Sequence, residues 1–245
     1  MAHAKYRLAG MNVLAFDTCF DACSACVAQL RDDGTFELAS ALERFEIGHA
    51  ERLLPMIEEV MQRAGVAFEK IDRLAVTVGP GTFTGTRIGV AAARALALTT
   101  GIDVVGASSL AVMAEAALRE LAPLARDAEL VVAVDARRGQ AYVQLFGASA
   151  TEPKLPPQLL TIEDASRIGD GPLVAVGSAA EAVAAAAATS GRSVIARLPD
   201  LLPDAAALAR MAVRLPASQA PLVPLYLRPP DAKPQDGKSI ARAQQ

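Results

Sequence analysis

One stretch of this sequence, residues 76–101 (VTVGPGTFTGTRIGVAAARALALTTG), constrains the fold more than any other. Small β-branched residues run directly into the glycines at 79 and 81, and a Thr-rich turn then leads into a helix from about Gly85. A strand, a glycine loop and a helix N-terminus in succession can present backbone N–H groups to an anion. The residues match neither a P-loop nor a G-x-G-x-x-G fingerprint. An anion-binding loop and a purely structural turn therefore both fit this stretch.

The helix that follows the loop has small residues at every fourth position, namely Gly85, Gly89, Ala93 and Ala97. A face with almost no side chains allows another backbone to approach closely. A surface helix normally keeps a polar face, but here apolar residues continue around most of the helix. We expect burial from more than one side, either as the central helix of one domain or between its own sheet and a partner.

Composition limits the classes of function. A chain of 245 residues that is 52% hydrophobic can build one large domain or two smaller lobes. The formal net charge of -3 provides no basic field that could hold nucleic acid unaided. No apolar run suits a membrane span, and the N-terminus does not resemble a signal peptide. We therefore expect a cytoplasmic protein that reaches RNA, if at all, through another subunit.

The cysteines and histidines do not form a metal motif. Cys23 and Cys26 have the C-x-x-C spacing, but they fall in a predicted strand over residues 22–30, where side chains three apart point to opposite faces. His49 opens a predicted helix, and the position one turn later is Leu53 rather than a second histidine. We expect no metal site and three reduced thiols.

Hydrophobic periodicity predicts the order β-β-β-α-β-α-β-α for the first half of the chain, which is typical of a mixed sheet with helices packed on it. The first strand ends in Asp17, whose carboxylate could hold a metal-bound phosphate or simply cap the next turn. The predicted strands cover residues 11–18, 22–30, 35–42, 71–78 and 102–106, and the predicted helices cover residues 49–64, 85–100 and 109–121.

The second half begins with a clear hairpin, residues 129–135 and 140–146, which restarts the strand-first pattern. A second lobe built like the first is therefore expected. The predicted lobes are residues 1–106 and 107–228, followed by a polar tail over residues 229–245 that we expect to be disordered. Within the second lobe we predict a strand over residues 173–176 and helices over residues 179–188 and 204–215, the last one capped by Asp204.

Several segments together resemble one known family. They occur in the family's order over nearly the whole chain, and they are LAFDT, GHAERLLP, VTVGPGTFTGTRIGVAAARALA, GASSLAVMA, VDARRGQAYVQLF and the closing YLR. This sequence resembles the TsaB (YeaZ) family, a subunit of the bacterial machinery that makes threonylcarbamoyladenosine on tRNA. The resemblance implies the two-lobed α/β fold of actin-like ATPases (ASKHA, RNase H-like), in which each lobe is a mixed sheet flanked by helices.

The resemblance also implies a function. The catalytic relative, TsaD, transfers threonylcarbamoyl to N6 of adenosine 37 in tRNA and carries a histidine pair on the helix where this chain has only His49. The chain is then expected to be a non-catalytic subunit that scaffolds and activates a TsaD-like enzyme. Its other expected partners are a TsaE-like ATPase and, when it is alone, a second copy of itself.

The expected site residues follow the matched motifs, and none of them is assigned a catalytic or metal-binding role. The glycine loop and the end of the first strand correspond to the phosphate side of the superfamily's nucleotide site. ATP or ADP is expected to bind weakly or at the junction with the partner, and no cofactor is expected to bind tightly. The residues expected beside the nucleotide are Asp17, Thr18, Gly79, Pro80, Gly81, Thr82 and Arg87. The first two helices are expected to form the partner surface: Leu53, Leu54, Ile57, Met61, Gly85, Ile88, Gly89, Ala92, Ala93 and Leu96.

Two other functions remain as alternatives. A stand-alone actin-like ATPase or kinase would need a carboxylate base, for which Asp17 and Asp135 are the candidates. An M22-type glycoprotease would need a zinc site, which two histidines far apart in the sequence do not provide. ATP turnover by the chain alone would favour the first alternative over the subunit hypothesis.

Overall fold

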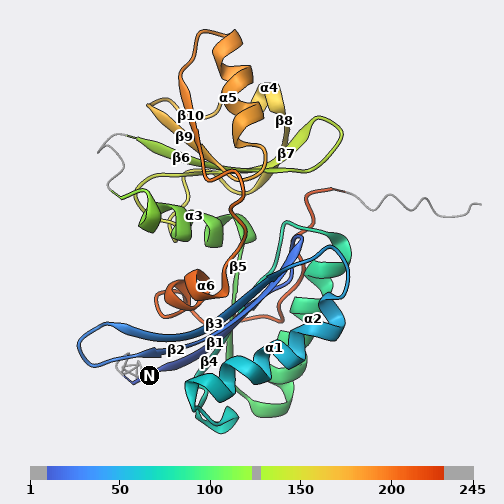
Figure 1. Cartoon of the computed structure of the whole chain (residues 1–245), viewed down its shortest axis with the longest axis vertical. Helices are drawn as coiled ribbons and strands as arrows, with labels where there is room; N and C mark the ends of the chain where they lie inside the picture. The colour runs from blue at the N-terminus through green and yellow to red at the C-terminus, as the bar shows by residue number, and fades with distance from the viewer. Residues whose placement is uncertain (1–9, 123–127, 229–245) are drawn as a thin grey trace, which may run out of the picture.

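The computed structural model describes residues 10–122 and 128–228 of the chain. They form two lobes, each built on a five-stranded sheet (Figure 1). The tail predicted over residues 229–245 lies outside the described residues. The helices of the described part are all too short or too polar to span a bilayer.

The first sheet has the strand order β3-β2-β1-β4-β5, with an antiparallel meander followed by parallel strands. Two helices make the crossover connections and lie on the same face of the sheet, as Figure 1 shows. The elements are β1 (Asn12–Asp17), β2 (Ala22–Leu30), β3 (Phe36–Arg44), α1 (His49–Ala64), the short 3-10 helix η1 (Phe68–Lys70), β4 (Arg73–Thr77), α2 (Phe83–Thr100) and β5 (Asp103–Ala107).

The second sheet has the order β10-β9-β6-β7-β8, which repeats the plan of the first sheet when its strands are taken in chain order. The predicted repeat of the first lobe's pattern is thus confirmed. Two of its four-residue strands, β8 and β10, were not predicted, because both contain polar residues and are only partly buried, whereas the predicted β9 is entirely apolar. The elements are β6 (Glu129–Asp135), β7 (Gln140–Phe146), β8 (Gln158–Thr161), α4 (Ile162–Ala165), β9 (Leu173–Val176), α5 (Ala180–Thr189) and β10 (Val194–Arg197).

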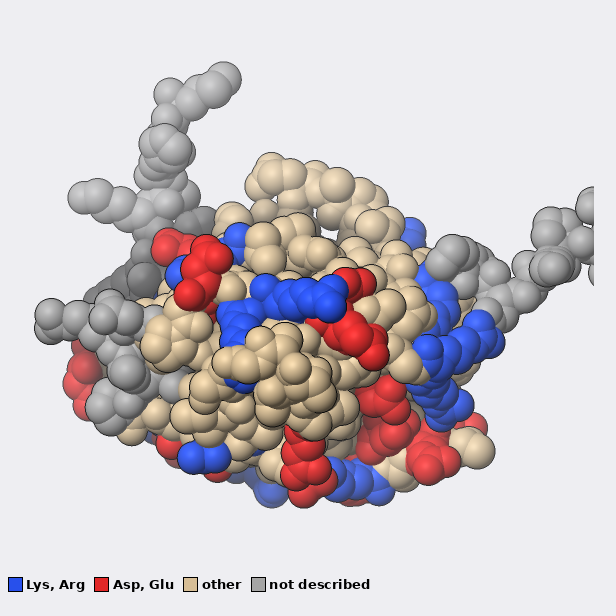
Figure 2. Space-filling view, turned by 90° about the horizontal axis from the view of Figure 1, so that it is seen from above, with Lys and Arg blue, Asp and Glu red and all other residues tan. Residues whose placement is uncertain are grey.

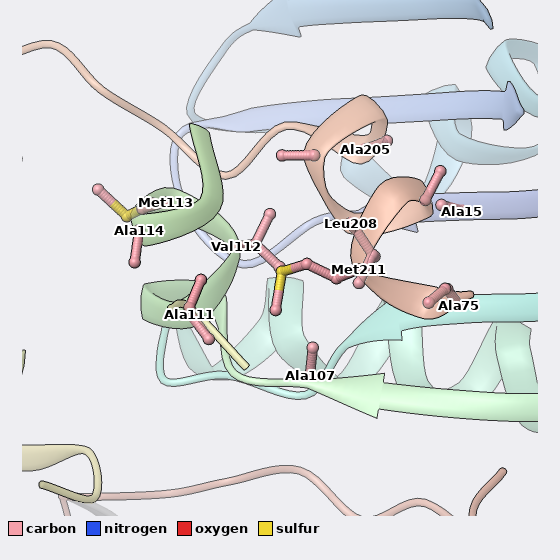
Figure 3. Packing of buried hydrophobic residues seen from close by; sticks show 14 of the residues in the cluster. Ala15, Ala75, Ala107, Ala111, Val112, Met113, Ala114, Ala205, Leu208 and Met211 are labelled. Carbon is pink, nitrogen blue, oxygen red and sulfur yellow. The ribbon is translucent and has the colours of Figure 1, made fainter. Parts of the chain in front are cut away.

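Two helices, α3 (Ser109–Glu120) and α6 (Ala205–Ala212), lie between the sheets (Figure 1). Figure 3 shows Leu208 and Met211 of α6 reaching between alanines of the first sheet and Val112 of α3. One hydrophobic cluster runs from the first sheet through both helices to Leu130 and Phe146 of the second sheet. The lobes therefore share a continuous core.

The lobe boundary differs from the simple division at residue 106. We expected residues 107–228 to belong to the second lobe, but the strands of the second sheet end at Arg197 and α6 contacts β1, β2, β3 and β4 of the first sheet. The first sheet is apolar on both faces, and α1 and α2 cover only one of them. Because the other face also needs cover, the chain returns to it with a helix rich in alanine.

The two cysteines of the C-x-x-C pair point to opposite faces of β2, as predicted. Cys23 lies in the cluster beneath α1, and Cys26 lies in the cluster shared with α6. Burial raises the pKa of each thiol to about 12, so both remain protonated at neutral pH. Within residues 10–122 and 128–228, no group of three or more His, Cys, Asp and Glu side chains is placed to hold a metal ion.

Arg73 ties the first sheet to the end of α6. Its buried guanidinium donates from Nη1 to the carbonyl oxygens of Ala212 at 2.7 Å and Leu215 at 3.0 Å. Replacing Arg73 with Met keeps most of the stem but removes these charged hydrogen bonds. We expect Arg73→Met to lower the free energy of unfolding by about 2 kcal/mol. Urea denaturation measures the loss, and Arg210→Met, whose hydrogen bond stays within α6, is the control. Equal stability of the two variants would contradict this role.

Candidate functional site

The end of β1 places Asp17 inside the first lobe. Parallel pairing of β1 with β4 brings Thr77 beside it, and the Thr77 hydroxyl donates to Asp17 Oδ1. The Cys19 amide also donates to the carboxylate, at 3.3 Å. Burial raises the pKa of Asp17 to about 6, although the hydrogen bonds from Thr77 and Cys19 act in the opposite direction. The Asp17 side chain is 0% exposed.

The glycine turn after β4 packs tightly against the turn after β1. A Cβ atom on Gly81 would lie 2.2 Å from the Cys19 carbonyl oxygen, so only glycine fits there. The amide of Thr82 donates to the same carbonyl at 2.6 Å. On the other side, the Ser109 amide donates to Gly79 O at 2.9 Å and the Ser109 hydroxyl donates to Pro80 O. The turn is thus held from both sides by the protein itself.

The first turn of α2 closes the same junction. The Thr82 side chain caps the helix by accepting from the Gly85 amide at 3.1 Å, which is why α2 begins at Phe83 rather than at the predicted Gly85. The Thr18 hydroxyl donates to Gly85 O at 2.7 Å, and a Cβ on Gly85 would lie 2.0 Å from Thr18 O. Thr18, like Asp17, is fully buried.

The predicted nucleotide-adjacent residues are therefore brought together, but their polar groups bind one another. Neither the carboxylate of Asp17 nor the hydroxyl of Thr18 is accessible to a phosphate or to its metal ion. Arg87 lies apart from them, since its Nε donates to the Tyr226 hydroxyl at 2.7 Å and its guanidinium lies 3.7 Å from the centre of the Phe83 ring. The side chains of Asp17 and Thr18 therefore do not fit a metal-bound nucleotide phosphate, and the glycine turn packs against the turn after β1 as a structural junction.

An accessible cavity of about 560 Å³ lies between the lobes, beside this junction. Its walls come from the turn after β1, the glycine turn, the β6–β7 turn and the C-terminal segment, and they include both carboxylates and arginines: Phe20, Asp21, Pro80, Gly81, Thr82, Phe83, Asp135, Ala136, Arg137, Tyr142, Leu225, Tyr226, Leu227 and Arg228. In the β6–β7 turn, Arg137 and Arg138 both have positive φ angles, of 63° and 58°. Asp135 stabilises this turn by accepting from the Arg137 amide at 2.8 Å.

The predicted partner residues divide into inward and outward groups. Leu53, Ile57 and Met61 of α1 are buried beneath the helix, whereas Leu54 is 58% exposed. Leu54 borders a shallow groove of about 510 Å³ that runs along the end of α1 to Phe68. The first helix therefore offers an apolar edge rather than a broad apolar face.

On α2, the small-residue stripe faces inward, which corrects the expectation that it lies open to a partner. Gly85, Gly89 and Ala93 are buried, and a Cβ on Gly89 would meet the side chains of Thr18 and Val76. The stripe lets α2 approach its own sheet closely. The helical spacing predicted that α2 has a face of small residues, but it did not indicate whether that face packs on the chain's own sheet or on a partner.

The outward side of α2 contains exposed apolar residues that are not in the predicted partner set. Leu98 is 87% exposed, and Ala91 and Ala95 lie on the same exposed side. The predicted Ile88, Ala92 and Leu96 are half-buried at its border. The spacing of Ala91, Ala95 and Leu98, at i, i+4 and i+7, could have indicated a second apolar stripe.

Comparisons with known proteins found a matching family model and several relatives. A family model described as "TsaD: tRNA N6-adenosine threonylcarbamoyltransferase" matches residues 43–212. The TsaB protein of Escherichia coli, named for tRNA threonylcarbamoyladenosine biosynthesis, is 37% identical over 132 residues, which are 54% of this chain and 53% of that protein. The alignment thus spans only about half the length of this curated relative. An uncharacterized protein of Mycobacterium tuberculosis is 32% identical over 91% of this chain and 94% of its own length.

A solved structure agrees. The crystal structure of a Pseudomonas aeruginosa protein with similarity to the peptidase YeaZ has a TM-score of 0.72 and 27% identity, and the alignment covers 89% of this chain and all of that chain. Two lobes that repeat one strand order, with a cleft bordered by the turns after β1, β4 and β6, define a two-lobed α/β protein. The chain belongs to the TsaB (YeaZ) family.

Proposed function

We propose that this chain is a non-catalytic subunit required for threonylcarbamoyl transfer to N6 of adenosine 37 in tRNA, and that it acts by binding a TsaD-like catalytic subunit. The observation that carries the proposal is that two candidate reactive side chains, those of Asp17 and His49, are buried in internal contacts. Asp17 is buried within hydrogen bonds. His49 is also buried, with Nε2 2.8 Å from the Phe20 carbonyl oxygen and its ring 4.9 Å from that of Phe45.

The outward side of α2, together with Leu54 of α1, is the surface that we propose for the TsaD-like partner. Exposed apolar side chains such as Leu98 lose contact with water when a partner covers them. In the absence of that partner, the same surface would pair with a second copy of the chain. A TsaE-like ATPase is the other partner that we propose for the assembly.

We further propose that tRNA binds to the assembled complex and not to this chain alone. The net charge of -3 gives no general attraction to RNA. Figure 2 shows basic and acidic side chains interspersed over the end of the second lobe rather than one basic field. The proposal includes no tightly bound cofactor, and ATP or ADP would bind only weakly or at the junction with the partner.

A matched pair of variants tests the partner surface. Ala95 on α2 and Ala185 on α5 are both exposed helical alanines, so a glutamate at either position should leave the fold intact. We expect Ala95→Glu to weaken binding to a purified TsaD-like subunit by about tenfold or more, because it places a charge in an apolar contact. Ala185→Glu should bind like the unmodified chain. Isothermal titration calorimetry measures both affinities.

The result that would overturn the surface is equal affinity of Ala95→Glu, Leu98→Glu and Ala185→Glu for the catalytic subunit. The non-catalytic role has a separate test. We expect the chain alone to turn over no ATP and to support threonylcarbamoyladenosine formation only when the catalytic subunit is added. ATP hydrolysis by the isolated chain that Asp17→Asn abolishes would instead favour the ATPase or kinase alternative.

A further inference from the structure

The C-terminal segment crosses from one lobe to the other after α6. The Ser218 amide donates to Val104 O at 2.9 Å, along the outer edge of β5. Leu222 then enters the core beside α2 and is only 7% exposed. Its Cδ2 atom lies 2.8 Å from the position that a Cβ on Gly106 would occupy, so the glycine makes room for this anchor.

Beyond Leu222, the segment runs over the glycine turn. The Leu225 amide donates to Val78 O at 2.6 Å. The Leu225 carbonyl oxygen lies 2.8 Å from the position of a Cβ on Gly79. Figure 1 shows the red end of the described chain rising past α2 into the space between the lobes.

The last contacts of the segment are polar and more exposed. The Tyr226 ring stacks on Phe83 with centroids 5.1 Å apart, and its hydroxyl accepts from Arg87 Nε at 2.7 Å. Arg228 Nη2 donates to the side chain of Gln140 in β7 at 2.9 Å, which is a contact with the second lobe. Tyr226 is 41% exposed, in contrast to the buried Leu222.

We propose that residues 222–228 form a strap that gates the cavity between the lobes. Leu222 is the fixed anchor, and the contacts of Tyr226 and Arg228 hold the strap closed. Leu225, Tyr226, Leu227 and Arg228 form one wall of the cavity, so release of the polar end opens that wall without unfolding either sheet.

A thiol placed inside the cavity reports this opening. Ala136 lines the cavity and is buried, so Ala136→Cys should react slowly with a maleimide while the strap is closed. The native thiols are a built-in reference, because Cys19, Cys23 and Cys26 are all buried in the core. In the Ala136→Cys background, we expect the double change Tyr226→Phe and Arg228→Met to raise the labelling rate by about tenfold.

Gln219→Ala is the matched control, since within residues 10–122 and 128–228 the Gln219 side chain bonds only to the neighbouring Ala217 carbonyl oxygen. It should leave the labelling rate unchanged. An unchanged rate in the strap variant, or an equal rise for the native cysteines, would overturn the proposal. If Ala136→Cys does not fold, hydrogen exchange of residues 136–140 in chains with native cysteines gives the same comparison, and equal exchange in the strap variant and the Gln219→Ala control would overturn the proposal. Neither readout needs a catalytic partner, so its outcome is independent of the proposed function.

Discussion

Gly85→Ala is expected to lower the free energy of unfolding by about 3 kcal/mol or more, although alanine is the better helix former. The new methyl group would lie 2.0 Å from the Thr18 carbonyl oxygen. Because that atom belongs to the backbone at the end of β1, α2 would have to move away from its sheet. Thermal and denaturant unfolding measure the loss.

The same substitution elsewhere provides the comparison. Among the residues that the structure describes, a Cβ on Gly147 would meet only the flexible end of Lys154, at 3.4 Å, so Gly147→Ala should change stability little. Gly89→Ala should fall between the two, because its nearest contact is the Thr18 side chain rather than the backbone. If Gly85→Ala is as stable as Gly147→Ala, α2 does not depend on this close approach.

Asp17→Asn is expected to raise the free energy of unfolding at pH 7 by about 3 kcal/mol, because burial raises the pKa of this carboxyl from 3.8 to about 6. The folded state thus binds a proton more tightly than the unfolded state. The stability that the protonated carboxyl contributes is complete below about pH 4 and is lost as the pH rises through about 6. Denaturant unfolding between pH 4 and 8 measures this component, which should be missing from Asp17→Asn.

Asp32→Asn is the control, because Asp32 is exposed in the turn between β2 and β3. It should keep the pH dependence of the unmodified chain. Identical pH profiles for the unmodified chain and Asp17→Asn would show that the carboxyl is not held in a desolvated site. A strong loss of stability in Asp17→Asn at every pH would instead indicate that the hydrogen bonds from Thr77 and Cys19 fit a carboxyl group but not an amide.

Local sequence patterns predicted the elements that depend on local interactions. The bounds of α1 are those predicted, because its amphipathic stripe ends at a glycine in the left-handed conformation, Gly65. The predicted cap at Asp204 is also confirmed, by a hydrogen bond from the amide of Ala206. The strands β8 and β10 depend on pairing with β7 and β9, which the four residues of each strand do not record.

In the candidate site too, the sequence predicted some features and could not predict others. The motifs assigned Asp17, Thr18 and the glycine turn to one site. In the structure these residues lie together, because β1 and β4 pair in parallel. The orientation of the polar groups toward one another depends on packing at the level of single atoms. For the same reason, the stripe of Gly85, Gly89 and Ala93 could not be assigned to an inner or outer face from spacing alone.

The return of α6 to the first sheet has a consequence for synthesis of the chain. Arg73 and Ala212, which are joined by a hydrogen bond, lie 139 residues apart in the sequence. During translation, the strands of the first sheet emerge from the ribosome long before the helix that covers their second face. Since an uncovered apolar sheet is prone to aggregation, the nascent first lobe needs protection until the second lobe has also been made. The first lobe therefore becomes a finished domain only after the strands of the second sheet and α6 have been synthesised.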